Sequence, residues 1–170
     1  MAAITEKIKG RVLDARAGLD QFGSTQYLPL GARVETEEGA TYVYCKASAT
    51  ITGQGYFCVV DAAHAATMIT KTLADQGHPE NGPWTGNGAA AANDYGWVCV
   101  RAQPGSGPGV QVAASTSVDA GCYSSGTAGQ LDTVATSQTL IVGVHLNTAQ
   151  GSAAGVNTTA VINTARAEVA

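Results

Sequence analysis

Residues 140–146 carry the clearest hydrophobic pattern of the chain, an alternation with the two-residue period of a β-strand. The alternation predicts that one face of this strand packs in a core while the other faces outward. We expect the inward side chains to be those of Leu140, Val142, Val144 and Leu146, and the outward ones to be those of Ile141, Gly143 and His145.

A second predicted strand, residues 95–102, is apolar on both faces. Val98 and Val100 point to one side, and Trp97 and Cys99 to the other, because strand side chains alternate. Such a strand is either covered on both sides of its sheet or presents one face to a partner. We expect Val98 and Val100 to share one core with the inward residues of 140–146.

Further short strands follow, separated by residues that favour turns. The sequence Glu37-Glu38-Gly39 predicts a hairpin turn, with glycine supplying a positive φ. Residues 62–75 fit either a helix capped by Gly77 or a strand, and residues 77–93 predict a long loop. The other expected strands are residues 32–36, 41–47, 56–60, 110–115, 118–123, 130–135 and 158–163.

This spacing predicts an all-β fold, a small β-barrel or β-sandwich of short strands. Residues 31–170 form the expected β domain, and residues 1–30 an extended N-terminal arm. The arm holds isolated apolar residues that have no regular period, so we expect it to contact a neighbouring protein subunit instead of packing in its own core. These residues are Ile4, Ile8, Leu13, Leu19 and Phe22, and the basic residues among them are Lys7, Lys9, Arg11 and Arg16. The alternative is a frayed terminus.

Composition points to surfaces that meet other proteins. Charged residues make up 13% of the chain, against about 25% in typical domains. The net charge of −4 argues against nucleic-acid binding, which usually requires a basic patch. The start of the chain has no apolar core of a signal peptide, and no run approaches a membrane span, so we expect neither export nor membrane contact.

The residues that could carry chemistry do not form a convincing motif. Cys45, Cys58, Cys99 and Cys122 lack CxxC spacing, and without export we expect four reduced, buried thiols rather than disulfides or a zinc site. Residues 86–91 match G-x-G-x-x-A, but neither the preceding strand nor the following helix of a dinucleotide site is present. A cysteine–histidine hydrolase is the weakest alternative. We therefore expect no enzyme activity, no cofactor and no metal.

In order along the chain, several segments resemble tailed-bacteriophage head decoration (cement) proteins. Together they cover roughly residues 28–146, and the long 77–93 segment departs from the pattern. The segments are residues 31–52 with GARV…EGATYVYCKASATIT, residues 93–98 with NDYGWV, residues 128–132 with AGQLD, residues 141–144 with IVGV, and the closing tail 160–166 with AVINTAR.

The resemblance implies a virion protein that binds the capsid exterior between subunits of the major capsid protein and stabilises the head. It implies self-association as well, as a trimer first and a dimer next, of a chain made in the host cytoplasm. Trp84, Tyr95 and Trp97 complete the expected interface residues. The alternative is a carbohydrate-binding or adhesive β-module in which these three aromatic rings stack on sugars. Lattice position, copy number, host, and whether the 77–93 loop meets a host surface stay open.

Overall fold

The computed structural model describes residues 18–74, 78, 80–118, 121–134, 138–157 and 160–167. The described residues are nearly all β, with 41% in strands and 3% in a helix, which confirms the predicted all-β class. The elements are β1 (Arg33–Glu35), β2 (Thr41–Ala47), β3 (Phe57–Val60), β4 (Ala65–Met68), α1 (Lys71–Ala74), β5 (Glu80–Pro83), β6 (Tyr95–Ala102), β7 (Val110–Val112), β8 (Cys122–Ser124), β9 (Leu131–Asp132), β10 (Leu140–His145), β11 (Gly155–Asn157) and β12 (Val161–Ala167).

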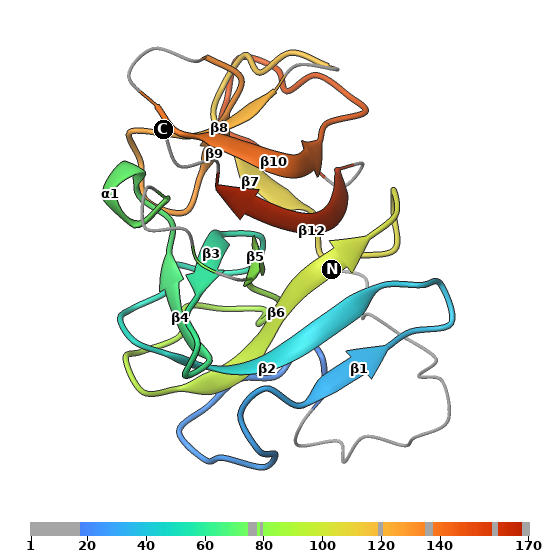
Figure 1. Ribbon diagram of the computed structural model, residues 1–170. Coiled ribbons are helices and arrows are strands. Elements are labelled where there is room, and N and C mark those ends of the chain that lie inside the picture. Colours follow the sequence, from blue (N-terminus) through green and yellow to red (C-terminus); the bar gives the residue numbers. More distant parts are fainter. Residues whose placement is uncertain are drawn as a thin grey trace.

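The strands form one strongly curled sheet. Its order is β1-β2-β4-β3-β5-β12-β10-β8-β9-β7-β11, and β6 pairs with both β2 and β12. The pairings of β2, β4, β3, β5, β12 and β6 therefore return on themselves as a ring. Figure 1 shows the blue to green strands below, the orange strands above, and the red β12, which closes the ring, between them. We call residues 18–102 the barrel lobe and residues 103–167 the C-terminal lobe, whose last strand β12 also closes the ring.

Strand β6 is covered on both faces within the chain itself. Val98 and Val100 lie in one buried cluster with Trp84, inside the ring. Trp97 and Cys99 lie in a second cluster, which also holds Val144 and Leu146 of the C-terminal lobe. The expectation of a single shared core is thus wrong, because alternation along β6 sends adjacent side chains into different cores.

The inward and outward positions of β10 change partway along the strand. Ile141 is buried and Val142 is exposed, the reverse of the prediction, whereas Val144 and Leu146 are buried as predicted. The register between β10 and β12 shifts between Val142 and Val144, and Gly143 has a φ of +89°. Residues 163–165 of β12 lie opposite the single residue Gly143, so the extra residues of this irregularity belong to β12. The positive φ of Gly143 breaks the regular strand geometry of β10, and the alternation of buried and exposed positions is inverted on one side of it.

The structure gives the secondary structure of the two segments 62–75 and 77–93. Residues 62–75 contain both a strand, β4, and the single helical turn α1. The predicted 77–93 loop is corrected, because it contains β5, which pairs with β3. Gly82 lies where β5 crosses β6 so closely that a Cβ there would meet the carbonyl oxygen of Cys99 at 1.8 Å. Residues that are typical of loops therefore form an interior strand here. The close approach of this strand to β6 requires a residue without a Cβ at position 82.

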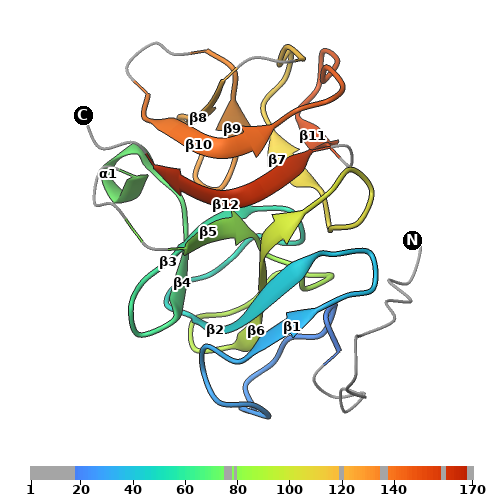
Figure 2. The same ribbon diagram turned by 45° about the vertical axis from the view of Figure 1, so that its right-hand side comes forward.

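The described part of the N-terminal arm packs on its own chain. Leu19 is 5% exposed, and its carbonyl oxygen accepts a hydrogen bond from the Thr85 hydroxyl. Gly23 pairs with Tyr95 as an isolated antiparallel bridge, which fixes the segment along β6. For residues 18–30, therefore, the expectation of an arm held away from its own core does not hold. Figure 2 shows this blue segment passing beneath β1 and β6.

Three glycines leave the space in which the side chain of Phe22 packs. A Cβ at Gly86 would lie 2.7 Å from Phe22 Cδ1, at Gly88 3.3 Å from Cζ, and at Gly96 3.3 Å from Phe22 Cβ. Phe22 also packs against the barrel-interior cluster. The G-x-G-x-x-A segment thus makes room for an aromatic ring, which explains its glycines without a nucleotide.

Phe22→Ala should lower the free energy of unfolding by about 2–3 kcal/mol, because the ring leaves an unfilled space between three glycines. Phe22→Leu should cost clearly less. Urea denaturation followed by tryptophan fluorescence measures both. Tyr27→Ala is the matched control, since Tyr27 lies in the same segment with an exposed ring, and equal stability of Phe22→Ala and this control would contradict the account.

Candidate functional site

The structure buries most of the described predicted interface residues in its cores. Trp84 and Trp97 are fully buried in the two cores, and Leu19 is buried between the arm and the barrel lobe. Only Phe22 and Tyr95 are partly exposed. This corrects the expectation for the three buried residues, which have no surface open to a partner. The remaining predicted contacts, Ile4, Ile8 and Leu13, lie outside the described residues.

Tyr95 belongs to an aromatic group on the outer face of the barrel lobe. Its ring stacks on Tyr44 with centroids 6.3 Å apart, and Tyr44 meets Trp97 edge-on at 5.1 Å. The ammonium of Lys46 lies 5.8 Å from the Tyr95 centroid, within cation–π range. One face of Tyr95 is therefore already occupied by protein.

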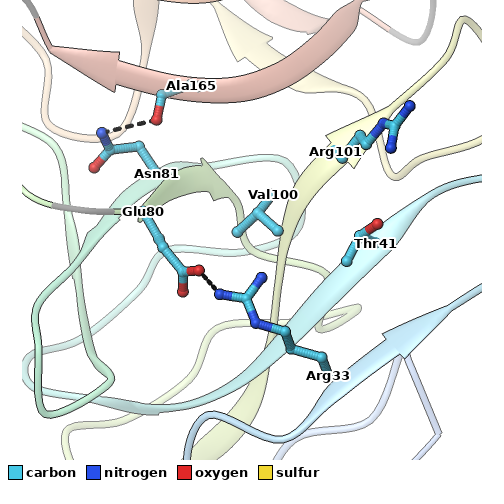
Figure 3. Close-up of a pocket in the computed structure, with 7 residues that line it drawn as sticks. All are labelled: Arg33, Thr41, Glu80, Asn81, Val100, Arg101 and Ala165. Carbon is cyan, nitrogen blue, oxygen red and sulfur yellow. Dashed lines mark hydrogen bonds and ion pairs between the residues drawn. The ribbon is translucent and has the colours of Figure 1, made fainter.

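A cleft of about 210 Å³ opens at the end of the ring, where β1, β2, β5, β6 and β12 converge (Figure 3). A bulge in β6 lies at its lining. Thr41 pairs with Arg101 and Tyr42 with Cys99, so Val100 is an extra residue in β6. The lining residues are Arg33, Thr41, Glu80, Asn81, Val100, Arg101 and Ala165.

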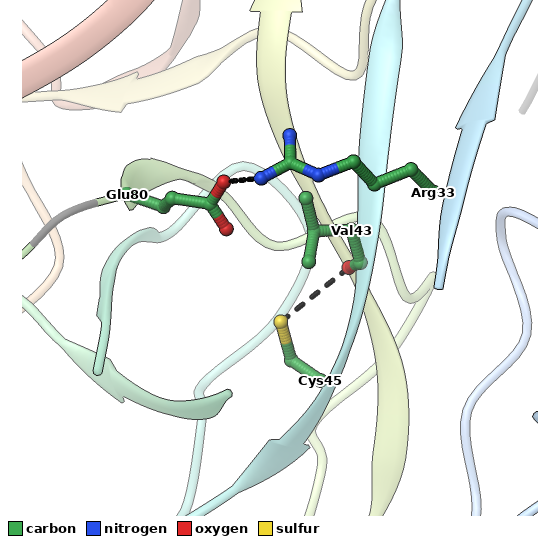
Figure 4. Close-up of polar contacts among 4 residues, drawn as sticks. All are labelled: Arg33, Val43, Cys45 and Glu80. Carbon is green, nitrogen blue, oxygen red and sulfur yellow. Dashed lines mark hydrogen bonds and ion pairs between the residues drawn. The ribbon is translucent and has the colours of Figure 1, made fainter. Parts of the chain in front are cut away.

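The polar groups of the cleft are largely committed to holding strands together. The Arg33 guanidinium forms an ion pair with Oε1 of Glu80, which ties β1 to β5 across the end of the ring (Figure 4). Asn81 Nδ2 donates a hydrogen bond to the carbonyl oxygen of Ala165 at 3.1 Å, which ties β5 to β12. Glu80 Oε2 and Asn81 Oδ1 are buried acceptors without a protein donor.

The cleft offers acceptor oxygens and guanidinium donors, but its lining contains no cysteine or histidine. Its chemistry fits the binding of a small polar group and the closure of the barrel. Sequence reasoning missed it because Glu80 and Asn81 were assigned to a loop. The only signal of this cleft in the sequence was the polar pair Glu80-Asn81, which directly precedes Gly82.

The thiols occupy the cores. All four cysteines are buried, and no disulfide joins them. Burial raises the pKa of the Cys45 thiol to about 12, with a further contribution from Asp61, and burial raises that of Cys122 to about 12. Burial also raises the pKa of the Cys58 thiol, with Cys45 adding to the effect. A nucleophilic cysteine needs a lowered pKa, so these three side chains are poor candidates for catalysis.

The C-terminal lobe differs from the barrel lobe in charge. Residues 103–167 contain three charged residues, Asp119, Asp132 and Arg166, and the other nineteen of the chain lie outside this range. Among the described residues, four of the five exposed large hydrophobic side chains lie in this lobe, between 36% and 54% exposed. They are Val118, Val134, Val142 and Val156.

Two of these valines lie on adjacent segments. The backbone N–H of Ser117 donates to the hydroxyl of Thr133 at 3.0 Å, which brings the residues next to Val118 and Val134 together. The absence of charge from this half was visible in the sequence, but the exposure of the valines was not, because a valine in a short strand is usually buried.

The structure places no three His, Cys, Asp or Glu side chains together as a metal site within its described residues. No helix in the described ranges is long and apolar enough to span a membrane.

Comparison of the chain with protein-family models, with curated protein sequences and with solved structures finds no match.

Three of the thiols should resist modification in the folded protein. At pH 8 a thiol with a pKa of about 12 is ionised in roughly one molecule in ten thousand. We expect reaction of Cys45, Cys58 and Cys122 with Ellman's reagent to be at least about 100-fold slower in the native protein than in guanidinium, where all four thiols react. Rapid native reaction of any of the three, located by mass spectrometry, would contradict this assignment.

Arg33→Gln should lower the free energy of unfolding by about 1–2 kcal/mol, because it leaves the mostly buried Glu80 carboxylate without its charged partner. Solvent screening of the half-exposed Arg33 keeps the effect at this size. The double variant Arg33→Gln/Glu80→Gln should recover part of the loss. Urea unfolding measures all three proteins, and a neutral single variant would show that the pair does not stabilise the ring.

Proposed function

We propose that the protein is a non-enzymatic virion protein that binds the exterior of a phage capsid between major capsid subunits and stabilises the head. The observation that carries the proposal is the C-terminal lobe, with its exposed valines and almost no charge. Depletion of charge together with exposed apolar side chains favours a surface that meets protein. The ordered resemblance to decoration proteins supplies the kind of partner.

The mechanism is one of added contact area. An expanded shell has thin seams that are strained by the packaged DNA, and a small rigid β domain can lie across a seam. A standard interface buries about 1,600 Å². Because many copies attach to one lattice, modest contacts multiply in effect. In this proposal the partners are the major capsid protein and further copies of the chain, as a trimer or a dimer, on the outside of the virion.

The positions of the aromatic residues disfavour the alternative, a carbohydrate-binding or adhesive module. Sugar stacking requires an aromatic face open to solvent. Trp84 and Trp97 have no exposed surface, and Tyr95 carries Tyr44 and Lys46 against its ring. The capsid proposal needs none of these three rings at the surface.

The direct test mixes purified protein with shells assembled from the major capsid protein encoded by the same genome. We expect saturable co-sedimentation with expanded shells and a higher temperature of shell disruption. A glycan array in parallel tests the alternative. Binding to glycans without binding to shells would overturn the proposal.

Deletion of the arm in two steps should separate attachment from folding. Removal of residues 2–17 should leave the unfolding temperature unchanged but weaken shell binding by about tenfold or more, because Lys7, Lys9, Arg11 and Arg16 are then lost from contact with an acidic capsid surface. Removal of residues 2–27 should also destabilise the fold, because it takes away Leu19 and Phe22. If the shorter deletion binds shells with unchanged affinity, the arm does not contribute to attachment.

A further inference from the structure

We infer that Asn87 is a site of spontaneous covalent modification, at which the side-chain amide is lost through a cyclic imide formed with the backbone nitrogen of Gly88. Three features point to this site: the asparagine–glycine sequence, the exposure of Asn87 and the hydrogen bonding around the pair. Water is the co-reactant, and no partner protein is needed. The modification therefore does not depend on the proposed capsid role.

The reaction requires a backbone nitrogen that can reach the side-chain carbonyl carbon of the asparagine before it. The Gly88 nitrogen loses its proton and bonds to Cγ of Asn87, while the Cγ–Nδ2 bond breaks and ammonia leaves. Water then opens the imide at either carbonyl carbon, which gives aspartate or isoaspartate, and nothing is oxidised or reduced. Glycine at the second position favours the ring, because it has no Cβ to hinder the approach.

The structure leaves the reacting atoms of this pair accessible. Asn87 and Gly88 lie in a bend, and Asn87 is exposed. Within the described residues, neither the Asn87 side chain nor the N–H of Gly88 has a hydrogen-bond partner in the protein. The backbone N–H of Asn87, by contrast, donates to the carbonyl oxygen of Asp20 at 3.2 Å. No hydrogen bond within the protein therefore has to break before the nitrogen of Gly88 meets the amide.

A second asparagine–glycine pair of the chain is protected by its packing. Asn81 is fully buried, and its Nδ2 donates to the carbonyl oxygen of Ala165 at 3.1 Å. Gly82 pairs with Cys58 in the ladder between β3 and β5, and it lies so close to β6 that a Cβ has no room. The rotation that closes an imide ring is blocked in such a close-packed interior. The same dipeptide thus has one reactive and one protected copy.

The loop that contains the reactive pair is anchored at both ends. Trp84 forms a bridge to β6, and Ala90 forms a bridge to Ile51. Between these anchors the loop packs on Phe22, since a Cβ at Gly88 would lie 3.3 Å from Phe22 Cζ. Isoaspartate adds a methylene group to the main chain between two fixed ends, so the loop must change shape where it meets the ring. We expect the isoaspartate form to hold Phe22 less tightly.

Incubation of the folded full chain for several weeks in mildly alkaline buffer tests this inference. Peptide mapping by mass spectrometry measures amide loss at each asparagine, and labelling by an isoaspartate methyltransferase identifies the isoaspartate product. We expect Asn87 to convert at least about 20-fold faster than the buried Asn81. In guanidinium, where both pairs are unfolded, the two asparagines should convert at similar rates.

Asn147 is the control for exposure alone, because it is exposed but is followed by Thr148, whose branched Cβ hinders the ring. It should convert at least about tenfold slower than Asn87. Equal conversion of Asn87 and Asn81 in the folded protein would overturn the inference, and so would conversion of Asn87 no faster than that of Asn147.

Two variants test the consequence for Phe22. After the same incubation, the urea midpoint of the wild type should fall in proportion to its isoaspartate content, whereas that of Asn87→Gln should stay constant. Asn87→Asp adds the charge without the extra methylene group, and before incubation it should keep the wild-type midpoint because position 87 is exposed. An unchanged midpoint in wild-type protein that has converted to isoaspartate would overturn the link to Phe22.

Discussion

The two-sided burial of β6 is the constraint on which the rest of the structure depends. A strand with valines on one face and Trp97 and Cys99 on the other is stable only if a separate core covers each face. The ring of strands covers the valine face, and the C-terminal lobe contributes to the cover of the opposite face. This explains why the two lobes form one curled sheet, and why its apolar strands leave little hydrophobic surface on the barrel lobe.

In the barrel lobe, glycines allow backbones and aromatic rings to pack closely. Gly82 lets β5 cross β6 at backbone distance, and Gly86, Gly88 and Gly96 admit Phe22 against Trp84. Close approach of backbones and rings replaces the bulky side chains of a larger core. The Arg33–Glu80 ion pair then holds the first strand over the open end of the ring. Segments rich in glycine and asparagine are therefore interior parts of this fold.

Sequence reasoning succeeded where the pattern is local and failed where it depends on distant contacts. The hairpin around Gly39, the all-β class and the two-faced β6 follow from alternation and turn residues. The register shift opposite Gly143 could not be predicted, because the strand pattern of β10 continues across it and only the pairing with β12 shows the shift. Trp84 and Trp97 were expected at an interface, but their place in the cores is set by strands far away in sequence. The cleft was missed because the strands that line it are also far apart in the sequence.

Strand β12 has a consequence for how the chain folds. It pairs with β5, β6 and β10, and the Asn81–Ala165 hydrogen bond alone joins residues 84 positions apart. Closing loops of this length costs conformational entropy before the strand pairing contributes favourable free energy. We therefore expect folding to be slow for a domain of this size. A ribosome-bound chain cannot complete the ring until residues 161–167 have emerged. Until that moment β5 and β6 each have an unpaired edge, and unpaired edges are sites at which growing chains can aggregate.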